Sequence, residues 1–270
     1  MPELPEVETI VRDLQRLVTG ATIERATVLQ PDLIAGEAGT FAAILAGQRI
    51  EEISRRAKNL VFRLRGDRLI INLGMTGRVL VRDPGQDEPS HVGVRFELAD
   101  GRHILYQDVR RFGYLQILPA GEWEFRARAL GIEPLSDAFD ANTLYRLTRD
   151  SRVAIKTWLM DQQRVVGIGN IYASEALFRA RMTPRKAARR LTRAECERLH
   201  AAIRQVLQEA IDFRGTTLLD YRDAAGQAGE FARRLRVYDR TGDPCLVCGG
   251  PIRRIVQGGR STFYCPACQT

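Results

Sequence analysis

The first residues of the chain contain a group that can act as a nucleophile. Pro2 follows the initiator methionine, and removal of Met1 would leave a secondary amine at the chain terminus. A terminal amine titrates near pH ~7.7–8, so a useful fraction is unprotonated at neutral pH without deep burial. Such an amine can attack an electrophilic sugar carbon and form an iminium intermediate. The carboxylates of Glu3 and Glu6 stand close to it in the sequence.

The same residues also fit an ordinary helix start. Pro5 suits the first helical position, and acidic residues in the first turn complement the helix dipole. Apolar residues recur at helical spacing from Val7 to Val18, and Gly20 can end the helix. We therefore expect an amphipathic helix that presents Pro2 and Glu3 at its N-terminus. These residues alone leave the catalytic and the purely structural interpretation open.

Four cysteines near the end of the chain have metal-ligand spacing. They form the pattern C-x₂-C-x₁₆-C-x₂-C with Cys245, Cys248, Cys265 and Cys268. Two such knuckles can supply four thiolates to one tetrahedral zinc, although the spacing does not exclude iron. Disulfides are disfavoured, because the chain begins with no secretory signal and is expected in the cytoplasm. The residues between the knuckles can form a hairpin across Gly258-Gly259, which leaves Arg260 at its tip.

The charge is distributed unevenly along the 270 residues. Residues 1–130 contain 18 basic and 18 acidic residues, whereas residues 131–270 contain 23 and 15, which gives the net charge of +8. A basic half beside a neutral half indicates a polyanion bound mainly by the C-terminal part. The basic residues include only three lysines, Lys58, Lys156 and Lys186, and a lysine can release a proton where an arginine cannot. No apolar run is long enough to cross a bilayer.

The elements that position these groups change character along the chain. Short strand-like runs dominate as far as residue 118 and predict an antiparallel sandwich or barrel. Residues 119–140 resemble a linker, and helical periodicity follows. Thr192 and Glu195 form a capping box ahead of a helix whose apolar face includes Cys196. The expected strands are Thr22–Leu29, Arg49–Ser54, Asn59–Leu64, Leu69–Leu73, Arg78–Val81, Val92–Leu98, Arg102–Tyr106 and Phe112–Leu118.

Several motifs, taken in order, resemble the formamidopyrimidine-DNA glycosylases. The N-terminal string Met1–Thr9 is followed by Arg55–Lys58, Leu73–Gly77 and Arg110–Gly113, then by Gly167–Glu175 and the four-cysteine module. The resemblance covers essentially the whole chain. It implies an α+β multidomain protein: an N-terminal antiparallel β-sandwich with an N-terminal helix (residues 1–130), a helix-two-turns-helix domain (131–235), and a zinc ribbon (236–270). It also places a lesion-capping loop at residues 220–230.

The resemblance implies a bifunctional DNA glycosylase and abasic-site lyase of base-excision repair. Pro2 would attack C1′ of an oxidised purine nucleoside while Glu3 protonates the sugar ring oxygen. Lys58 and Arg260 would assist the charge and proton transfers of the following β- and δ-elimination. The expected cofactor is one structural zinc, and the expected partner is double-stranded DNA that contains oxidised purines or abasic sites. We expect a monomer in the cytoplasm, associated with the nucleoid, with no membrane partner.

The resemblance also implies a set of DNA contacts. Met75, Arg110 and Phe112 would fill the gap that a flipped nucleotide leaves, although a methionine and a phenylalanine are ordinarily core residues. The glycine turn before Asn170, which is a plausible N-cap, would bind phosphate on backbone N–H groups. Asn72 stands where many members have histidine, so some affinity for phosphate is lost there. The remaining expected contacts are His91, Arg152, Lys156 and Asn170.

Two other functions stay open at this point. The related endonuclease VIII type prefers oxidised pyrimidines, but it usually has glycine where this chain has Leu4. A non-catalytic damage sensor would bind abasic DNA without cutting it, and the intact Pro2-Glu3 pair argues against that function. Lys58 remains a competing nucleophile, because a lysine of lowered pKa also forms Schiff bases.

Overall fold

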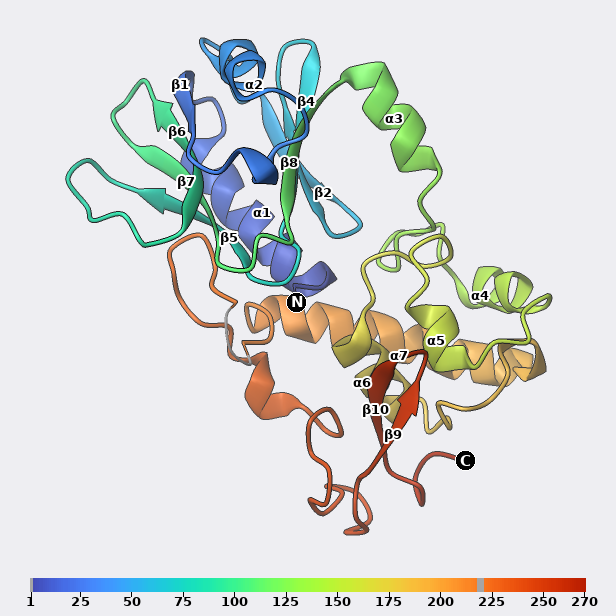
Figure 1. Ribbon diagram of the computed structural model, residues 1–270. Helices are drawn as coiled ribbons and strands as arrows, with labels where there is room; N and C mark the ends of the chain where they lie inside the picture. The colour runs from blue at the N-terminus through green and yellow to red at the C-terminus, as the bar shows by residue number, and fades with distance from the viewer. Residues whose placement is uncertain (1, 218–220) are drawn as a thin grey trace. The chain divides into compact units, whose positions relative to one another are not determined.

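The computed structural model describes residues 2–217 and 221–270 (Figure 1). Contacts divide the described chain into two compact units. The N-terminal unit comprises residues 1–128 and 213–232, and the C-terminal unit comprises residues 129–212 and 233–270. The helix-two-turns-helix domain was predicted to span residues 131–235, but residues 213–232 pack with the N-terminal unit. The three-domain division itself stays a prediction.

The N-terminal unit is built on two antiparallel sheets. The first has the strand order β1-β6-β7-β5, and the second has the order β2-β3-β4-β8. The predicted sandwich is therefore confirmed, with strand ends shifted by up to three residues. The strands are β1 (Ile23–Val28), β2 (Glu52–Arg56), β3 (Asn59–Arg63), β4 (Asp67–Asn72), β5 (Gly77–Arg82), β6 (Val92–Leu98), β7 (His103–Asp108) and β8 (Tyr114–Pro119).

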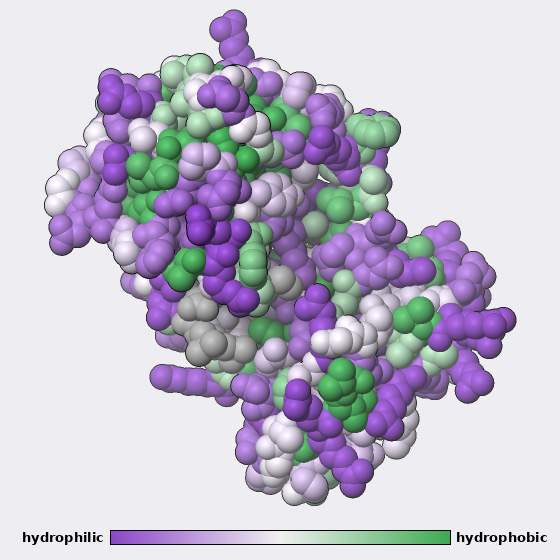
Figure 2. Space-filling model, viewed as in Figure 1, coloured by the Kyte–Doolittle hydropathy of each residue, from purple (hydrophilic) through white to green (hydrophobic). Residues whose placement is uncertain are grey.

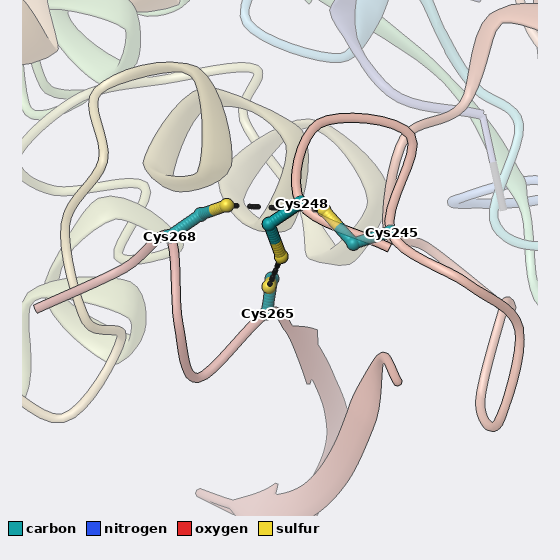
Figure 3. A group of neighbouring side chains, drawn as sticks. All are labelled: Cys245, Cys248, Cys265 and Cys268. Carbon is teal, nitrogen blue, oxygen red and sulfur yellow. Dashed lines mark hydrogen bonds between the residues drawn. The ribbon is translucent and has the colours of Figure 1, made fainter. Parts of the chain in front are cut away.

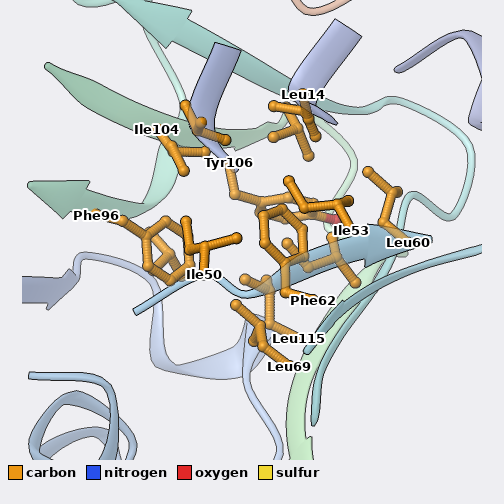
Figure 4. Close-up of a cluster of buried hydrophobic side chains, with 14 of the residues drawn as sticks. Leu14, Ile50, Ile53, Leu60, Phe62, Leu69, Phe96, Ile104, Tyr106 and Leu115 are labelled. Atoms are coloured by element: carbon orange, nitrogen blue, oxygen red, sulfur yellow. The ribbon is translucent and has the colours of Figure 1, made fainter. Parts of the chain in front are cut away.

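The core of this unit lies between the sheets and helix α1 (Leu4–Val18) (Figure 4). Phe96 and Tyr106 come from the first sheet, Phe62 and Leu115 come from the second, and Leu14 comes from α1. Each of these side chains is almost fully buried. Burial of one large apolar side chain stabilises a fold by about 1.5–3 kcal/mol, so this cluster fixes α1 against both sheets.

Two helices of the N-terminal unit were not predicted. Helix α2 (Ala38–Leu45) follows Glu37, whose carboxylate accepts the N–H groups of Gly39 and Thr40. Helix α3 (Ala120–Arg128) lies in the predicted linker and buries none of its residues. A helix without a buried face has no apolar periodicity, which explains why the sequence pattern did not reveal it.

The C-terminal unit is mainly helical and ends in a two-stranded hairpin. Helix α7 begins as the Thr192–Glu195 capping box predicts, since Glu195 N–H donates to Thr192 Oγ1 and Thr192 N–H donates to Glu195. Cys196 is buried in this helix, as expected. The elements are α4 (Ala141–Thr148), α5 (Ile155–Leu159), α6 (Asn170–Arg179), α7 (Arg193–Asp212), β9 (Arg253–Gln257) and β10 (Arg260–Tyr264).

The visible surface in Figure 2 is largely hydrophilic, with apolar side chains dispersed among charged ones. Exposed large apolar residues include Met75, Phe112 and Phe125. Across residues 2–217 and 221–270, every helix is too short or too polar to cross a bilayer.

The loop that presents Met75 gives a test of the fold. Gly74 has φ +52°, and a Cβ there would lie 2.4 Å from the Phe112 carbonyl carbon. We expect Gly74→Ala to lower the free energy of unfolding by roughly 2–4 kcal/mol, from backbone strain together with overpacking. The control is Gly47→Ala, where φ is +77° but no atom lies within 4 Å. It should cost only about 1 kcal/mol in urea unfolding. Equal losses of unfolding free energy in the two variants would contradict the close packing of Gly74 against the backbone of Phe112.

Candidate functional site

The predicted nucleophile lies at the start of α1 in a buried setting. Pro2 is buried, and Glu3, which precedes the first helical residue, is only 2 % exposed. The N–H of Glu3 donates to Glu6 Oε2 at 2.8 Å, so Glu6 closes the first helical turn. The structure therefore brings Pro2, Glu3 and Glu6 together at one helix end. Met1 lies outside the described residues.

Glu6 also binds a segment that is more than two hundred residues away in the sequence. Its Oε1 accepts the N–H of Thr216 at 2.7 Å, and its carboxylate is 1 % exposed. Gly215 has φ +81°, and a Cβ there would lie 3.0 Å from the Glu6 side chain. The hydroxyl of Tyr221 lies 3.4 Å from the Glu6 carbonyl oxygen. The buried carboxylate thus joins the start of α1 to residues 215–221, of which 218–220 are not described.

A second contact holds the same segment against α1. The Arg214 guanidinium contacts Asp13 on α1 and Asp223, with 2.6 Å between Arg214 Nη2 and Asp223 Oδ2. Asp223 is almost fully buried, and its other oxygen accepts the N–H groups of Ala225 and Gln227. The predicted capping loop covers residues 220–230. Residue 220 lies outside the described residues, and residues 221–230 form an anchored turn.

Lys58 lies in the turn between β2 and β3. Arg55 at the end of β2 donates to Ala57 O at 2.9 Å and to Glu8 Oε2 on α1 at 3.0 Å. Ala57 has φ +56°, which produces the tight turn. Arg55 therefore fixes the Lys58 turn against the N-terminal half of α1, which Pro2 and Glu3 directly precede.

The three predicted wedge residues lie on two loops that pack together. Met75 is partly exposed, and Phe112 is 59 % exposed. The Arg110 guanidinium lies 4.8 Å from the centre of the Phe112 ring, a distance at which cation and ring attract each other. Asp108 holds this loop by accepting the N–H of Gly113 at 2.8 Å. Phe112 is therefore an exposed aromatic on a rigid support, not a core residue.

Two further predicted contacts occupy the N-terminal unit. His91 is exposed, has φ +63°, and its ring contacts the Ser90 hydroxyl at 2.9 Å. Asn72 is half-buried and uses both ends of its amide, donating to Asn59 Oδ1 and accepting the N–H of Gly74. Asn72 therefore supports the Met75 loop in this structure. Its contact with phosphate stays a prediction.

Lys156 in the C-terminal unit is 1 % exposed. Its ammonium donates to Asn170 Oδ1 at the start of α6, to Thr262 Oγ1 at 2.8 Å and to Ser261 O at 3.3 Å on the hairpin. It joins α5, α6 and the hairpin. Direct contact of Lys156 with DNA stays a prediction. Arg152, another predicted DNA contact, is exposed and lies three residues before α5.

The glycine turn before α6 contains a residue in the left-handed region, and its contact with phosphate stays a prediction. Gly167 has φ +81°, and its N–H donates to Gln162 Oε1 at 2.8 Å. The N-cap of α6 is Gly169, so the prediction of Asn170 as N-cap was wrong by one residue. With Gly169 at the cap, the Asn170 amide is available to Lys156 rather than to the helix N–H groups.

The four cysteines converge as their spacing predicts (Figure 3). Their sulfur atoms all lie within 4.8 Å of one another, with 3.5 Å between Cys248 and Cys265 and 3.9 Å between Cys245 and Cys268. A tetrahedral zinc with Zn–S bonds of about 2.3 Å places its sulfurs about 3.8 Å apart. None of the five cysteines, all of which are described, forms a disulfide.

The electrostatics of the cluster also fit a bound cation. Burial acts to raise the pKa of Cys245, but N–H groups of Cys248 and Val247 at its sulfur bring that pKa down to about 7. Burial and the neighbouring sulfurs raise the pKa of Cys268 to about 12. Four thiolates this close together repel one another, so the ionised cluster requires a divalent cation.

The hairpin between the knuckles presents Arg260. Gly258 and Gly259 have φ values of +54° and +72°, which form a two-residue turn, and Arg260 is the exposed first residue of β10. Arg260 lines a hollow of about 380 Å³ together with Thr157 and Trp158 of α5. The predicted position of Arg260 at a hairpin tip is confirmed.

Comparison with known families covers nearly the whole chain. Residues 1–115 match the formamidopyrimidine-DNA glycosylase N-terminal domain, and residues 130–221 match the formamidopyrimidine-DNA glycosylase H2TH domain. Residues 242–270 match a zinc finger found in FPG and IleRS. The chain belongs to the formamidopyrimidine-DNA glycosylase family. The family zinc finger and the cysteine cluster together give the protein one structural zinc.

Individual members of the glycosylase family are similar over their full lengths. The formamidopyrimidine-DNA glycosylase of Thioalkalivibrio sulfidiphilus is 47 % identical, with complete coverage of both chains. The MutM (Fpg) structure from Thermus thermophilus is 42 % identical with a TM-score of 0.89, covering 99 % of this chain and 98 % of that one. The Lactococcus lactis Fpg in complex with abasic-site DNA is 33 % identical with a TM-score of 0.92, covering 99 % of both chains.

Sequence reasoning missed the residues that support the site. Asp13, Arg214 and Asp223 hold residues 213–232, and Glu175 accepts N–H groups of residues 236–238 ahead of the zinc finger. Burial raises the pKa of Glu175, and those N–H groups oppose the rise. These partners are 9 to 201 positions apart in the sequence, so they form no helical or strand periodicity that could have revealed them.

The zinc can be tested directly. We expect one zinc per chain by metal analysis, and we expect Cys245→Ser or Cys268→Ser to lose both the metal and DNA binding. The physical reason is that the hairpin carrying Arg260 is folded by its metal. Cys196→Ala is the control, because this thiol is buried in α7 and should leave the zinc content unchanged. Substantially less than one zinc in a fully active protein would contradict the assignment.

Proposed function

We propose that this chain removes oxidised purines, such as 8-oxoguanine and formamidopyrimidines, from duplex DNA and then cuts the strand at the abasic site. The observation that carries the mechanism is the buried pair Pro2 and Glu3 at the start of α1. Membership of the glycosylase family and the Lactococcus lactis relatives with abasic-site or Fapy-dG DNA support this function.

The first step is displacement of the base by the Pro2 nitrogen. After loss of Met1, this nitrogen is a secondary amine that attacks C1′ of the damaged nucleoside. Glu3 donates a proton to the ring oxygen of the sugar, and the ring opens. The base leaves with the glycosidic electron pair and takes up the proton that the Pro2 amine loses as the iminium forms. An acid that is 2 % exposed is protected from bulk water, which favours proton donation at one atom.

The second step is strand cleavage. The iminium between Pro2 and C1′ acidifies the C2′ proton, and its removal expels the 3′ phosphate by β-elimination. A further δ-elimination expels the 5′ phosphate. Lys58, in a turn fixed against α1, assists these proton transfers, and Arg260, at the hairpin tip, stabilises the phosphate charges.

DNA recognition uses both polar and apolar groups. Phe112 and Met75 replace the flipped nucleotide in the stack, and the guanidinium of Arg110 lies over the Phe112 ring. Arg152, His91 and the N–H groups near Asn170 contact phosphates, which fix the register without reading the sequence. Lys156 and Asn72 contribute by holding the loops that carry these groups.

Three further points belong to the proposal. The chain acts as a monomer, in the cytoplasm where bacterial chromosomal DNA lies. Its parts act as a catalytic domain (1–130), a helix-two-turns-helix domain (131–235, of which residues 213–217 and 221–232 pack with the N-terminal unit) and a zinc ribbon (236–270).

The nucleophile is tested by trapping. Borohydride should reduce the iminium and link the protein covalently to lesion-bearing DNA, with the sugar on residue 2 of a chain that lacks Met1. Pro2 is preferred over Lys58 because the reference pKa of a terminal amine is about 2–3 units lower. A variant with residues left ahead of Pro2 should bind DNA but neither excise nor trap. A Lys58 adduct from that variant would overturn the assignment.

The variant Glu3→Gln separates base excision from strand cleavage. The variant should lose base excision by roughly 10²–10⁴-fold, the usual contribution of a general acid. It should still cut pre-formed abasic sites, where no base has to leave. Equal loss on both substrates would show that Glu3 supports the structure of α1 rather than donating a proton.

The role of Arg260 is tested by salt dependence. Log affinity for duplex DNA should fall linearly with log salt, and Arg260→Ala should weaken binding and reduce the slope by about one phosphate contact. The control is Arg254→Ala, which removes a cation on the neighbouring strand whose Nε donates to Ser261. An unchanged slope and unchanged cutting in Arg260→Ala would mean that Arg260 is only a solvated side chain.

A further inference from the structure

The C-terminal unit contains a basic hollow at the side of the zinc finger. Its volume is about 440 Å³, and it lies between the end of α6, the C-terminal half of α7 and the two zinc knuckles. We call it the knuckle pocket. The residues that matter here are Arg179, Arg181, Arg234, Arg236, Glu209 and Val247.

The knuckle pocket has an excess of positive charge. Arg179 is neutralised by Glu209, with 2.8 Å between Arg179 Nη2 and Glu209 Oε2. Among the described residues, the side chains of Arg181 and Arg236 form no ion pair, and both are exposed. One carboxylate therefore faces four guanidinium groups, which leaves a local charge of about +3 for an anionic ligand.

The pocket is remote from the proposed phosphate contacts within the same unit. Asn170 begins α6 and Arg179 ends it, so at about 1.5 Å per residue roughly 13 Å separate them. The hairpin strands have five residues each, so at about 3.3 Å per residue roughly 15 Å separate the Arg260 tip from the knuckles. Neither Asn170 nor Arg260 lines the pocket, and the third proposed phosphate contact of this unit, Arg152, does not line it either.

The backbone at Arg181 is unfavourable for an arginine. Arg181 follows α6 with φ +54°, and its N–H donates to Phe178 O at 3.0 Å to end the helix. Glycine is the residue that such a left-handed helix end favours, because it has no Cβ. A long cationic side chain at this strained position points to a role in binding.

Apolar side chains border the pocket. Val247 of the first knuckle lines the pocket and is 61 % exposed, and its neighbour in the sequence, Leu246, is 58 % exposed. A ligand that fits this surface therefore carries negative groups beside an apolar side chain.

We propose that the knuckle pocket binds an acidic segment of a partner protein, with carboxylates on Arg181 and Arg236 and an apolar side chain on Leu246 and Val247. A hollow of about 440 Å³ accommodates a few side chains of a peptide. A DNA duplex presents phosphates on a convex cylinder and is better contacted by protruding cations such as Arg260. Charge complementarity and the apolar border together favour the peptide.

The experiment uses the full-length, zinc-loaded protein and a fluorescent peptide of alternating aspartate and leucine. A matched peptide has asparagine in place of aspartate. The acidic peptide should bind in fluorescence polarisation, and Arg181→Glu with Arg236→Glu should weaken it by about tenfold or more, because charge-assisted contacts become repulsive. Arg198→Glu, on an exposed part of α7, reverses one charge outside the pocket and should leave binding intact.

A second variant does not depend on reversing charges. Arg181→Gly removes the cation and relieves the left-handed strain, so it should unfold at a higher temperature while binding the peptide less tightly. Both variants should retain full zinc content and full cutting of lesion-bearing DNA.

Four results would overturn the proposal. The first is that the acidic peptide does not bind, and the second is that the asparagine peptide binds with the same affinity. The third is that the Arg181→Glu, Arg236→Glu variant binds the acidic peptide as tightly as the unchanged protein. The fourth is that this variant loses affinity for duplex DNA and that lesion-free duplex displaces the peptide. The last result would make the pocket a DNA contact instead.

Discussion

The arrangement of the N-terminal unit depends on one buried carboxylate. Glu6 accepts the N–H of Glu3 with one oxygen and the N–H of Thr216 with the other. Removal of the carboxylate would take this acceptor from both N–H groups, and the net contribution of one hydrogen bond is about 0.5–1.5 kcal/mol, or more where one partner is charged. Glu6 thereby sets the position of Glu3 and Pro2 and at the same time anchors residues 213–217. The reactive end of α1 is placed by tertiary contacts, not by the helix alone.

In the C-terminal unit, buried charges of both signs hold elements together. Lys156 is buried among oxygens of α6 and the hairpin, and Glu175 is buried among N–H groups of residues 236–238. A hydrogen bond to a charged group contributes about 1.5–3 kcal/mol, so each buried charge restricts the elements around it to one arrangement. The cysteine cluster applies the same rule with a metal ion as the compensating charge.

The sequence predicted the features that have local patterns. Alternating apolar residues located the strands, the Thr192–Glu195 box located the start of α7, and cysteine spacing located the metal site. It failed where local patterns are absent or misleading. Helix α3 has no buried face, and the contact of Glu6 with Thr216 spans 210 positions. Motifs placed the reactive residues, but the long-range supports became visible only in the structure.

The discontinuity of the N-terminal unit has a consequence for biosynthesis. Residues 1–128 form both sheets, yet the unit is completed only by residues 213–232. A ribosome adds about 5–20 residues per second, so the missing segment follows the first one after roughly 5–20 s. During that interval the nascent chain holds a β-sandwich whose Glu6 still lacks the Thr216 N–H. The amine-bearing end of α1 therefore reaches its final geometry only after most of the polypeptide has been made. Vectorial synthesis thus delays assembly of the reactive end of α1 until helices α6 and α7 have already been synthesised.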